Sequence, residues 1–170
     1  TLAQQFSAAG DVVVDSARAA DVCILNTCAV TSAAGRKSRR QIRALARDCP
    51  RVRIAVIGCY ATLAPRRCAE SPNVAWVIPN ERKGQIAREL ASTAPPCADV
   101  HARPPARTRA SVKVQDGCDQ HCTYCIVRLL RGRSRSRTMT EIVAEIQALT
   151  SVGCREVVLT GACLGAYGRD

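Results

Sequence analysis

The sequence lacks the features that mark a membrane or secreted protein. No apolar run among its 170 residues approaches the ~18 residues that a membrane-spanning helix needs. The chain opens with TLAQQFSAAG, which has neither a charged-then-apolar leader nor an initiator Met. It also lacks an internal repeat, and lysine is scarce. We therefore expect a cytoplasmic protein without a membrane partner, cut from a longer chain.

Arginine, in contrast, is abundant and gives the chain a formal net charge of +11. Such an excess suits a polyanionic partner such as RNA, although a compositional bias toward Arg and Ala would produce it as well. Hydrophobic residues make up 47% of the chain, enough to bury a core. The 11 cysteines are odd in number and follow no secretory leader, which favours the reduced thiols of a metalloprotein over disulfides.

The first 91 residues alternate between helical and extended patterns. Short loops between alternating helices and strands are typical of an α/β fold, in which helices cover a parallel sheet. Helices are expected at 1–9, 32–48, 61–69 and 81–91, and strands at 12–14, 22–26, 54–57 and 75–78.

A second unit is predicted after a Pro-rich linker. Residues 92–110 contain two Pro-Pro pairs and no periodicity, which is typical of a stiff linker between domains. Residues 111–170 then read as a strand, a cysteine-containing loop, a helix and a second strand. Thr138 and Glu141 match a capping box at the start of that helix. One strand–helix–strand unit cannot close a barrel, so we expect further sequence to follow.

Three cysteines in the second unit have the spacing of a metal site. Cys118, Cys122 and Cys125 form C-x3-C-x2-C, and three thiolates on one loop can bind three irons of a cubane cluster. The fourth iron would then stay open to a small molecule. Gly117 would allow the backbone to approach the cluster. The alternatives are a zinc site that uses His121 as fourth ligand and three unrelated cysteines.

This loop resembles the signature of the radical S-adenosylmethionine (radical-SAM) superfamily, including the aromatic residue before the last cysteine. The resemblance implies a [4Fe–4S] cluster on the three thiols, with S-adenosylmethionine chelated by the open iron and an electron donor for the cluster. Tyr124 would then lie against the adenine. Thr160 and Gly161 would end the strand that approaches the methionyl amino group.

Two further motifs narrow the resemblance to the methylthiotransferases. ILNTCAVT (24–31) and VIGCYA (56–61) are similar to cysteine motifs of that family's first domain, which implies that Cys28 and Cys59 are ligands of a second cluster. Both cysteines follow predicted parallel strands, where α/β sheets build their sites. Five other cysteines are interpreted as small apolar fillers or incidental surface thiols: Cys23, Cys49, Cys68, Cys97 and Cys154. The implied fold is a flavodoxin-like parallel-sheet domain followed by the first part of a radical-SAM partial barrel.

The chain departs from the family pattern in three places. The family's first cluster cysteine would precede the first residue, Arg128 stands where Pro is typical, and Cys163 stands where His or Asn is commoner. We therefore expect this chain to bind one cluster rather than two and to be inactive alone.

The substrate prediction depends on two weaker motifs. AVTSAAGRKSRR and LGAYGRD resemble the subgroup that methylthiolates threonylcarbamoyladenosine next to the tRNA anticodon. Isopentenyladenosine in tRNA and a ribosomal protein are the alternative substrates, and a noncatalytic metal-containing RNA-binding module is the alternative of another class. Arg131, Arg133 and Arg135 follow the cysteine loop and are candidates for binding RNA phosphates, unless they only form a solvated loop.

Overall fold

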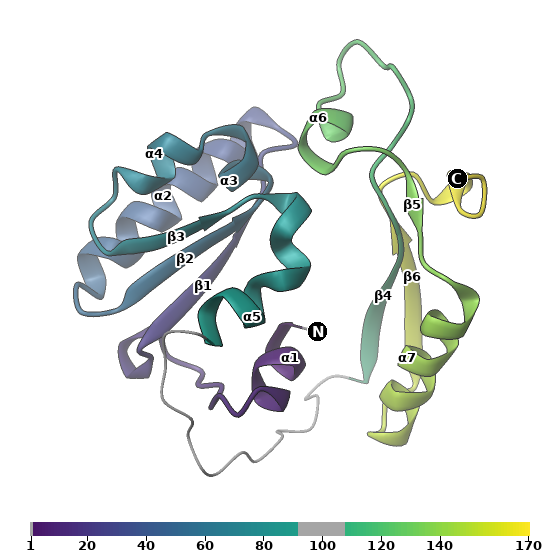
Figure 1. Cartoon of the computed structure of the whole chain (residues 1–170), viewed down its shortest axis with the longest axis horizontal. Helices are drawn as coiled ribbons and strands as arrows, with labels where there is room; N and C mark the ends of the chain where they lie inside the picture. Colours follow the sequence, from purple (N-terminus) through teal and green to yellow (C-terminus); the bar gives the residue numbers. More distant parts are fainter. Residues whose placement is uncertain (1, 92–107) are drawn as a thin grey trace. The chain divides into compact units, whose positions relative to one another are not determined.

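The computed structural model describes residues 2–91 and 108–170 (Figure 1). The chain divides into two compact units, Thr1–Ala102 and Arg103–Asp170. Of the linker predicted at 92–110, most lies outside the described residues. Within those residues, no helix is both long enough and apolar enough to cross a membrane.

The first unit is built on a parallel three-stranded sheet. β1 (Val22–Thr27), β2 (Arg53–Gly58) and β3 (Val74–Ile78) lie in the order β1-β2-β3. β2 is central, and its residues 54–57 are fully buried, as expected of an apolar strand covered on both faces. The helices α2, α3 and α4 lie on one face of this sheet, and α1 and α5 lie on the other (Figure 1). This arrangement is α/β and is consistent with the flavodoxin-like domain expected from the sequence.

The helices of this unit follow the predicted pattern, with local changes. Thr31 caps the longest one, since its hydroxyl accepts a hydrogen bond from the Ala34 N–H. The helix predicted at 61–69 is two short helices, because the residue before Pro65 is kept out of the helical region. The helix predicted at 81–91 begins as a 3₁₀ turn. The helices are α1 (Leu2–Ala8), α2 (Ser32–Asp48), α3 (Cys59–Leu63), α4 (Pro65–Ala69) and α5 (Ile86–Ala91), with 3₁₀ turns at Ala17–Ala19 and Asn80–Gln85.

The strand predicted at 12–14 is wrong. Val12, Val13 and Val14 are 57%, 54% and 41% exposed, and they pair with no described strand. A run of valines has high strand propensity, but that propensity reflects packing on a half-buried sheet surface. Here the run connects α1 to the 3₁₀ turn before β1, so it gains neither ladder hydrogen bonds nor burial.

The second unit contains the expected strand–helix–strand and two elements that were not predicted. β4 (Arg109–Asp116) pairs in parallel with β6 (Glu156–Gly161), and α7 (Met139–Ser151) connects them. The capping box at Thr138 is present as predicted. Apolar residues of β4 and α7 make the core, together with Cys154. The unpredicted elements are α6 (Val127–Arg131) and the short β5 (Arg135–Ser136), which pairs antiparallel with β4; a 3₁₀ turn follows at Leu164–Ala166.

Candidate functional site

The cysteine loop leaves the carboxyl end of β4 through a conformation that requires glycine. Gly117 has φ +74°, and a Cβ at this position would lie 1.8 Å from the backbone oxygen of Arg133. The Cys118 N–H donates a hydrogen bond to the Gly132 oxygen at 3.1 Å, and the Cys125 N–H donates to the Cys122 oxygen at 3.1 Å. The loop is therefore held against the segment that follows α6 and turns tightly between its last two cysteines.

Gln115 anchors the start of this loop, and the sequence analysis missed it. Its side chain is fully buried, and its Nε2 donates to the backbone oxygens of Asp116 and Gly117 and to the Ser134 hydroxyl. Its Oε1 accepts a hydrogen bond from the Cys163 N–H at 2.8 Å. One amide thus joins the cysteine loop to the segment after β6. The alternation of apolar and polar residues in VKVQ (112–115) places Gln115 on the polar face of the strand, so no local signal marked it as buried.

The thiols of this loop are accessible. Cys122 and Cys125 are exposed and Cys118 is partly exposed, while the Tyr124 ring is 90% exposed. Among residues 2–91 and 108–170, no three side chains of His, Cys, Asp or Glu converge as a preformed metal site. The three thiols therefore share one loop but are not gathered into a preformed site, and no fourth described ligand joins them.

The surroundings of His121 do not favour its use as a fourth ligand to zinc. The Arg128 guanidinium lies 2.7 Å from the His121 ring nitrogens, so this imidazole is engaged by a cation that would repel a metal ion. Tetrahedral zinc needs a fourth protein ligand in a structural site, whereas a cubane can be held by three thiolates with one iron open. The residues present fit a [4Fe–4S] cluster.

An ion network surrounds Asp116 at the mouth of the loop. Its carboxylate accepts hydrogen bonds from the Lys113 ammonium at 2.6 Å and the Gly117 N–H at 3.0 Å, and the Arg131 guanidinium lies at 3.3 Å. Burial raises the pKa of Asp116, but these three partners together lower it further than burial raises it, so the pKa is below its ordinary value. The carboxylate is charged at neutral pH and helps to hold the loop.

This network predicts a defined pH dependence. A carboxyl group with a depressed pKa in the folded state stabilises that state fully above its unfolded pKa of about 3.9, and the contribution is lost as the pH falls through the folded value. We expect the second unit to keep a constant free energy of unfolding from pH 7 to pH 5 and to lose stability below about pH 4. Asp116→Asn should lower the stability at pH 7 by about 1 kcal/mol and flatten the acid limb. Urea unfolding at each pH measures the free energy of unfolding and its loss below about pH 4. If the variant loses stability below pH 4 as the parent chain does, other carboxyl groups cause that loss.

The three arginines predicted to bind RNA differ in their surroundings. Arg131 is about two-thirds buried and pairs with Asp116. Arg133 is exposed, and so is Arg135, which donates to the Arg131 backbone oxygen at 3.4 Å. Arg137, the last of the basic run, pairs with Glu145 of α7 at 2.5 Å. The run thus contains both internal ion pairs and arginines directed to solvent.

The end of β6 lies next to the start of the cysteine loop. Gly161 pairs with Gln115 in the register of β4 and β6, and a Cβ on Gly161 would lie 3.0 Å from the Gln115 side-chain oxygen. The Thr160 hydroxyl donates to the Val112 oxygen at 3.4 Å. Carboxyl ends of neighbouring parallel strands are where α/β sheets form ligand sites.

In the first unit, Cys28 and Cys59 follow neighbouring strands at one edge of the sheet. Thr27 and Gly58, the residues before them, are partners in the parallel register. Cys28 is exposed, and its backbone is held by the Ser38 hydroxyl, which donates to the Cys28 oxygen at 2.8 Å. Cys59 is buried and begins α3. The two cysteines therefore lie at the same carboxyl edge.

Of the cysteines interpreted as fillers, Cys49, Cys68 and Cys154 are buried and Cys23 is partly exposed. Burial raises the pKa of the Cys68 thiol to about 11. The pKa of Cys23 is also raised, first by burial and second by the neighbouring Cys49. Cys154 is buried in the core of the second unit. These thiols are protonated at neutral pH or enclosed by apolar residues, as expected of fillers; Cys97 lies outside the described residues.

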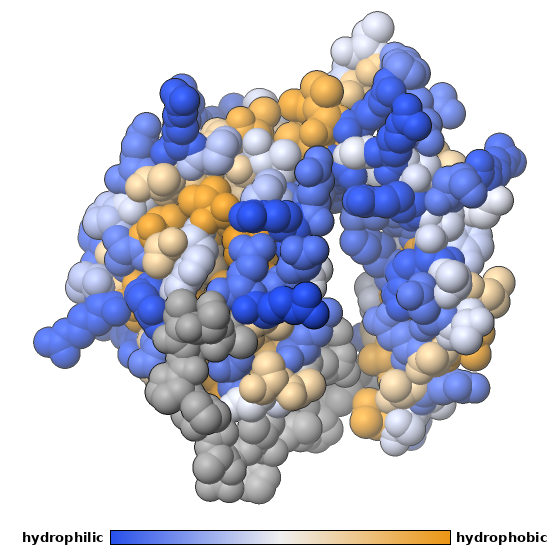
Figure 2. Space-filling model, in the orientation of Figure 1, coloured by the Kyte–Doolittle hydropathy of each residue, from blue (hydrophilic) through white to orange (hydrophobic). Residues whose placement is uncertain are grey.

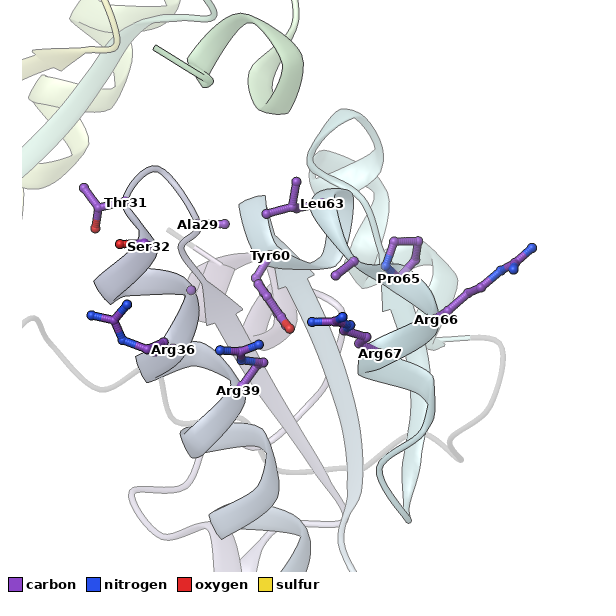
Figure 3. Close-up of a pocket in the computed structure, with 12 residues that line it drawn as sticks. Ala29, Thr31, Ser32, Arg36, Arg39, Tyr60, Leu63, Pro65, Arg66 and Arg67 are labelled. Carbon is purple, nitrogen blue, oxygen red and sulfur yellow. The ribbon is translucent and has the colours of Figure 1, made fainter. Parts of the chain in front are cut away.

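A cavity of about 750 Å³ adjoins the cysteine edge of the first unit (Figure 3). It lies between the first half of α2 and the two short helices α3 and α4, and its wall includes the residues directly after both cysteines, Ala29 and Tyr60. The sequence analysis did not predict it, because its wall comes from two segments about 30 residues apart. Four arginines line it: Arg36, Arg39, Arg66 and Arg67.

Comparison with known proteins agrees with both units. Residues 1–79 match the model of the uncharacterised protein family UPF0004, and residues 112–164 match the radical SAM superfamily. The chain is 39% identical to the threonylcarbamoyladenosine tRNA methylthiotransferase of Chlamydia pneumoniae, over 91% of this chain and 37% of the relative. It is 37% identical to the Bacillus subtilis protein of the same description, over 98% of this chain and 41% of the relative.

A second group of relatives carries a different description. The tRNA-2-methylthio-N(6)-dimethylallyladenosine synthase of Desulfitobacterium hafniense is 33% identical over 100% of this chain and 42% of its own length. With both units matched in order and similarity across most of its length, the chain belongs to the radical-SAM methylthiotransferase family. It spans about two-fifths of the length of these relatives.

Proposed function

We propose that this chain forms part of a tRNA methylthiotransferase, which replaces a C–H bond of a modified adenosine by C–SCH3. The observation that carries the proposal is the occurrence of two cysteine sites in one chain, each at the carboxyl edge of its own sheet. Relatives described as threonylcarbamoyladenosine tRNA methylthiotransferases match 88% to 99% of the chain. One S-adenosylmethionine would supply the methyl group and another the radical.

In this proposal the C-x3-C-x2-C loop holds the radical cluster. Cys118, Cys122 and Cys125 are its three ligands, and an external electron donor reduces it. When bound, the cluster supplies the electron that cleaves the sulfonium of S-adenosylmethionine. The exposed Tyr124 ring would cover the adenine, and Thr160 and Gly161 would bind the methionyl end at the edge next to the loop.

The first unit is proposed to handle the sulfur. Cys28 and Cys59 would supply two thiolates to a second [4Fe–4S] cluster, so that the whole enzyme holds two. Their adjacency at one strand edge supports this role, as does the accessibility of Cys28.

The proposed substrate is threonylcarbamoyladenosine next to the tRNA anticodon. Relatives with that description are 31% to 39% identical to this chain, whereas those described as dimethylallyladenosine synthases are 30% to 33% identical. The test is complementation of a deletion strain with the full-length gene, followed by mass spectrometry of the tRNA nucleosides. We expect the methylthio group to return on threonylcarbamoyladenosine. Its return on isopentenyladenosine would contradict the substrate, and its absence from tRNA would contradict the proposed function.

Arginines after the cysteine loop are proposed to bind the tRNA backbone. Hydrophilic side chains cover most of the face of the molecule in Figure 2, and the net charge is +11. Arg133 and Arg135 are exposed, whereas Arg131 also stabilises the loop through Asp116. Replacing Arg131 would therefore change the stability of the loop as well as RNA binding, and the two effects could not be separated.

The exposed pair gives a cleaner test. Arg133→Ala with Arg135→Ala should weaken tRNA binding and lower the slope of log K against log salt by about 1.4 to 1.8, since each lost phosphate contact removes roughly 0.7 to 0.9. Arg155→Ala, exposed at the opposite end of β6, is the single-charge control and should leave the slope nearly unchanged. Fluorescence anisotropy over a salt series measures the slopes. If the slope of the double variant equals the parent's, the two arginines are only solvated.

A further inference from the structure

The cavity of the first unit converges on one tyrosine and two arginines. Arg39 of α2, Tyr60 of α3 and Arg67 of α4 line the cavity of about 750 Å³, and the same three line an adjoining hollow of about 110 Å³. In Figure 3 the Tyr60 hydroxyl points between the Arg39 and Arg67 side chains, whereas Arg66 points away. Arg36 lies one helical turn from Arg39, at the rim. The donors thus come from three helices and meet at one place.

The charge around these donors is strongly positive. No Asp or Glu lines the larger cavity, and Glu70 is the one acidic residue that lines the smaller hollow. In the described part of the chain, neither Arg39 nor Arg67 forms an ion pair with a carboxylate. Guanidinium groups brought together without counter-charges repel one another, and a bound anion relieves that repulsion.

The Tyr60 hydroxyl gives an independent indication of a ligand. Tyr60 is only 4% exposed, yet its hydroxyl has no hydrogen-bond partner among the described residues. A buried hydroxyl without a partner destabilises the folded state, so such groups are uncommon unless a ligand or an ion satisfies them. An anion between Arg39 and Arg67 would accept this hydrogen bond.

We propose that Arg39, Arg67 and the Tyr60 hydroxyl form a phosphate-binding site, with Arg36 at its rim. Two guanidinium groups and one hydroxyl offer more donors from more directions than the two oxygens of a carboxylate can accept, which favours the several oxygens of a phosphate. The phosphate belongs either to an RNA backbone or to a small phosphate compound. This site does not use the cysteine loop, and its existence is independent of the proposed methylthiolation.

Binding of two probes to the full 170-residue chain tests the proposal: pyrophosphate and a synthetic anticodon stem–loop RNA. Arg39→Gln with Arg67→Gln should weaken binding at least about tenfold, the effect of losing one charge-assisted hydrogen bond or more. The matched control is Arg40→Gln with Arg88→Gln, which removes the same charge from exposed positions that line neither hollow. Isothermal titration calorimetry measures pyrophosphate, and fluorescence anisotropy measures the RNA.

The two probes separate the sources of the phosphate. Weaker binding of the RNA, with pyrophosphate competing against it, supports a site for the RNA backbone. Weaker binding of pyrophosphate alone supports a site for a small phosphate compound. Equal binding by the test and control variants, for both probes, would overturn the proposal.

Tyr60→Phe distinguishes a ligand-binding hydroxyl from one with a purely structural role. Removal of an unsatisfied hydroxyl should raise the melting temperature of the ligand-free chain by a few degrees. The same change should weaken pyrophosphate or RNA binding several-fold, so stability and affinity move in opposite directions. Unchanged affinity for both probes would exclude the hydroxyl from the site.

Discussion

Replacing Cys118, Cys122 and Cys125 together by Ala is expected to abolish iron–sulfur binding by the second unit. The parent chain, reconstituted anaerobically with iron and sulfide, should hold about one [4Fe–4S] cluster, because three thiolates on one loop can bind three of its irons. Adding S-adenosylmethionine should alter the EPR spectrum of the reduced cluster. The triple variant should lose both the absorbance and the EPR signal.

The control for this experiment is Cys163→Ala. Cys163 is partly exposed in the same unit, and it contacts the loop's anchor Gln115 only through its backbone, so its thiol is dispensable in this proposal. Stoichiometric zinc without iron uptake would contradict the cluster. Two full clusters on the parent chain would show that a third thiol joins Cys28 and Cys59, contrary to the expectation of one.

Gly117→Ala is expected to destroy the cysteine loop without removing a ligand. A Cβ there would lie 1.8 Å from the Arg133 backbone oxygen and 2.8 Å from the Gly132 oxygen, and φ is +74°. Neither neighbour is a side-chain end that can swing away, so the loop or the segment after α6 must shift. The strain of the positive φ and the backbone displacement together should cost about 3 kcal/mol or more.

Gly132→Ala is the matched control for that substitution. Gly132 has a similar φ of +78°, but a Cβ there would meet nothing within 4 Å. Its cost should be limited to the backbone conformation: with ψ −161° this is a region that residues other than glycine rarely adopt, so we expect about 1 to 3 kcal/mol. Urea unfolding and cluster uptake should both be impaired much more by Gly117→Ala. Equal effects of the two substitutions would mean that the close approach at Gly117 is not what holds the loop.

Local patterns predicted the regular elements well where one short segment contains all the information. The bounds of α2 (Ser32–Asp48) match the helix predicted at 32–48 from its apolar period, and the capping box at Thr138 follows from two residues three apart. β2 was predicted by its short apolar run and is fully buried. The prediction of a strand at 12–14 is wrong because a strand also needs a partner elsewhere in the chain. Its valines had the propensity of a strand but no neighbouring described strand with which to pair.

The cysteines themselves could be selected from the sequence, because spacing and position after a predicted strand are local properties. The sequence by itself determined the α/β class, the three-thiol loop and the two cysteines that follow parallel strands. Only the tertiary structure decided that Gln115 joins the loop to the segment after β6, and that Arg39, Tyr60 and Arg67 meet at one cavity. These contacts depend on which segments lie side by side, and that is set by packing between residues distant in the chain rather than by the preferences of any one of them.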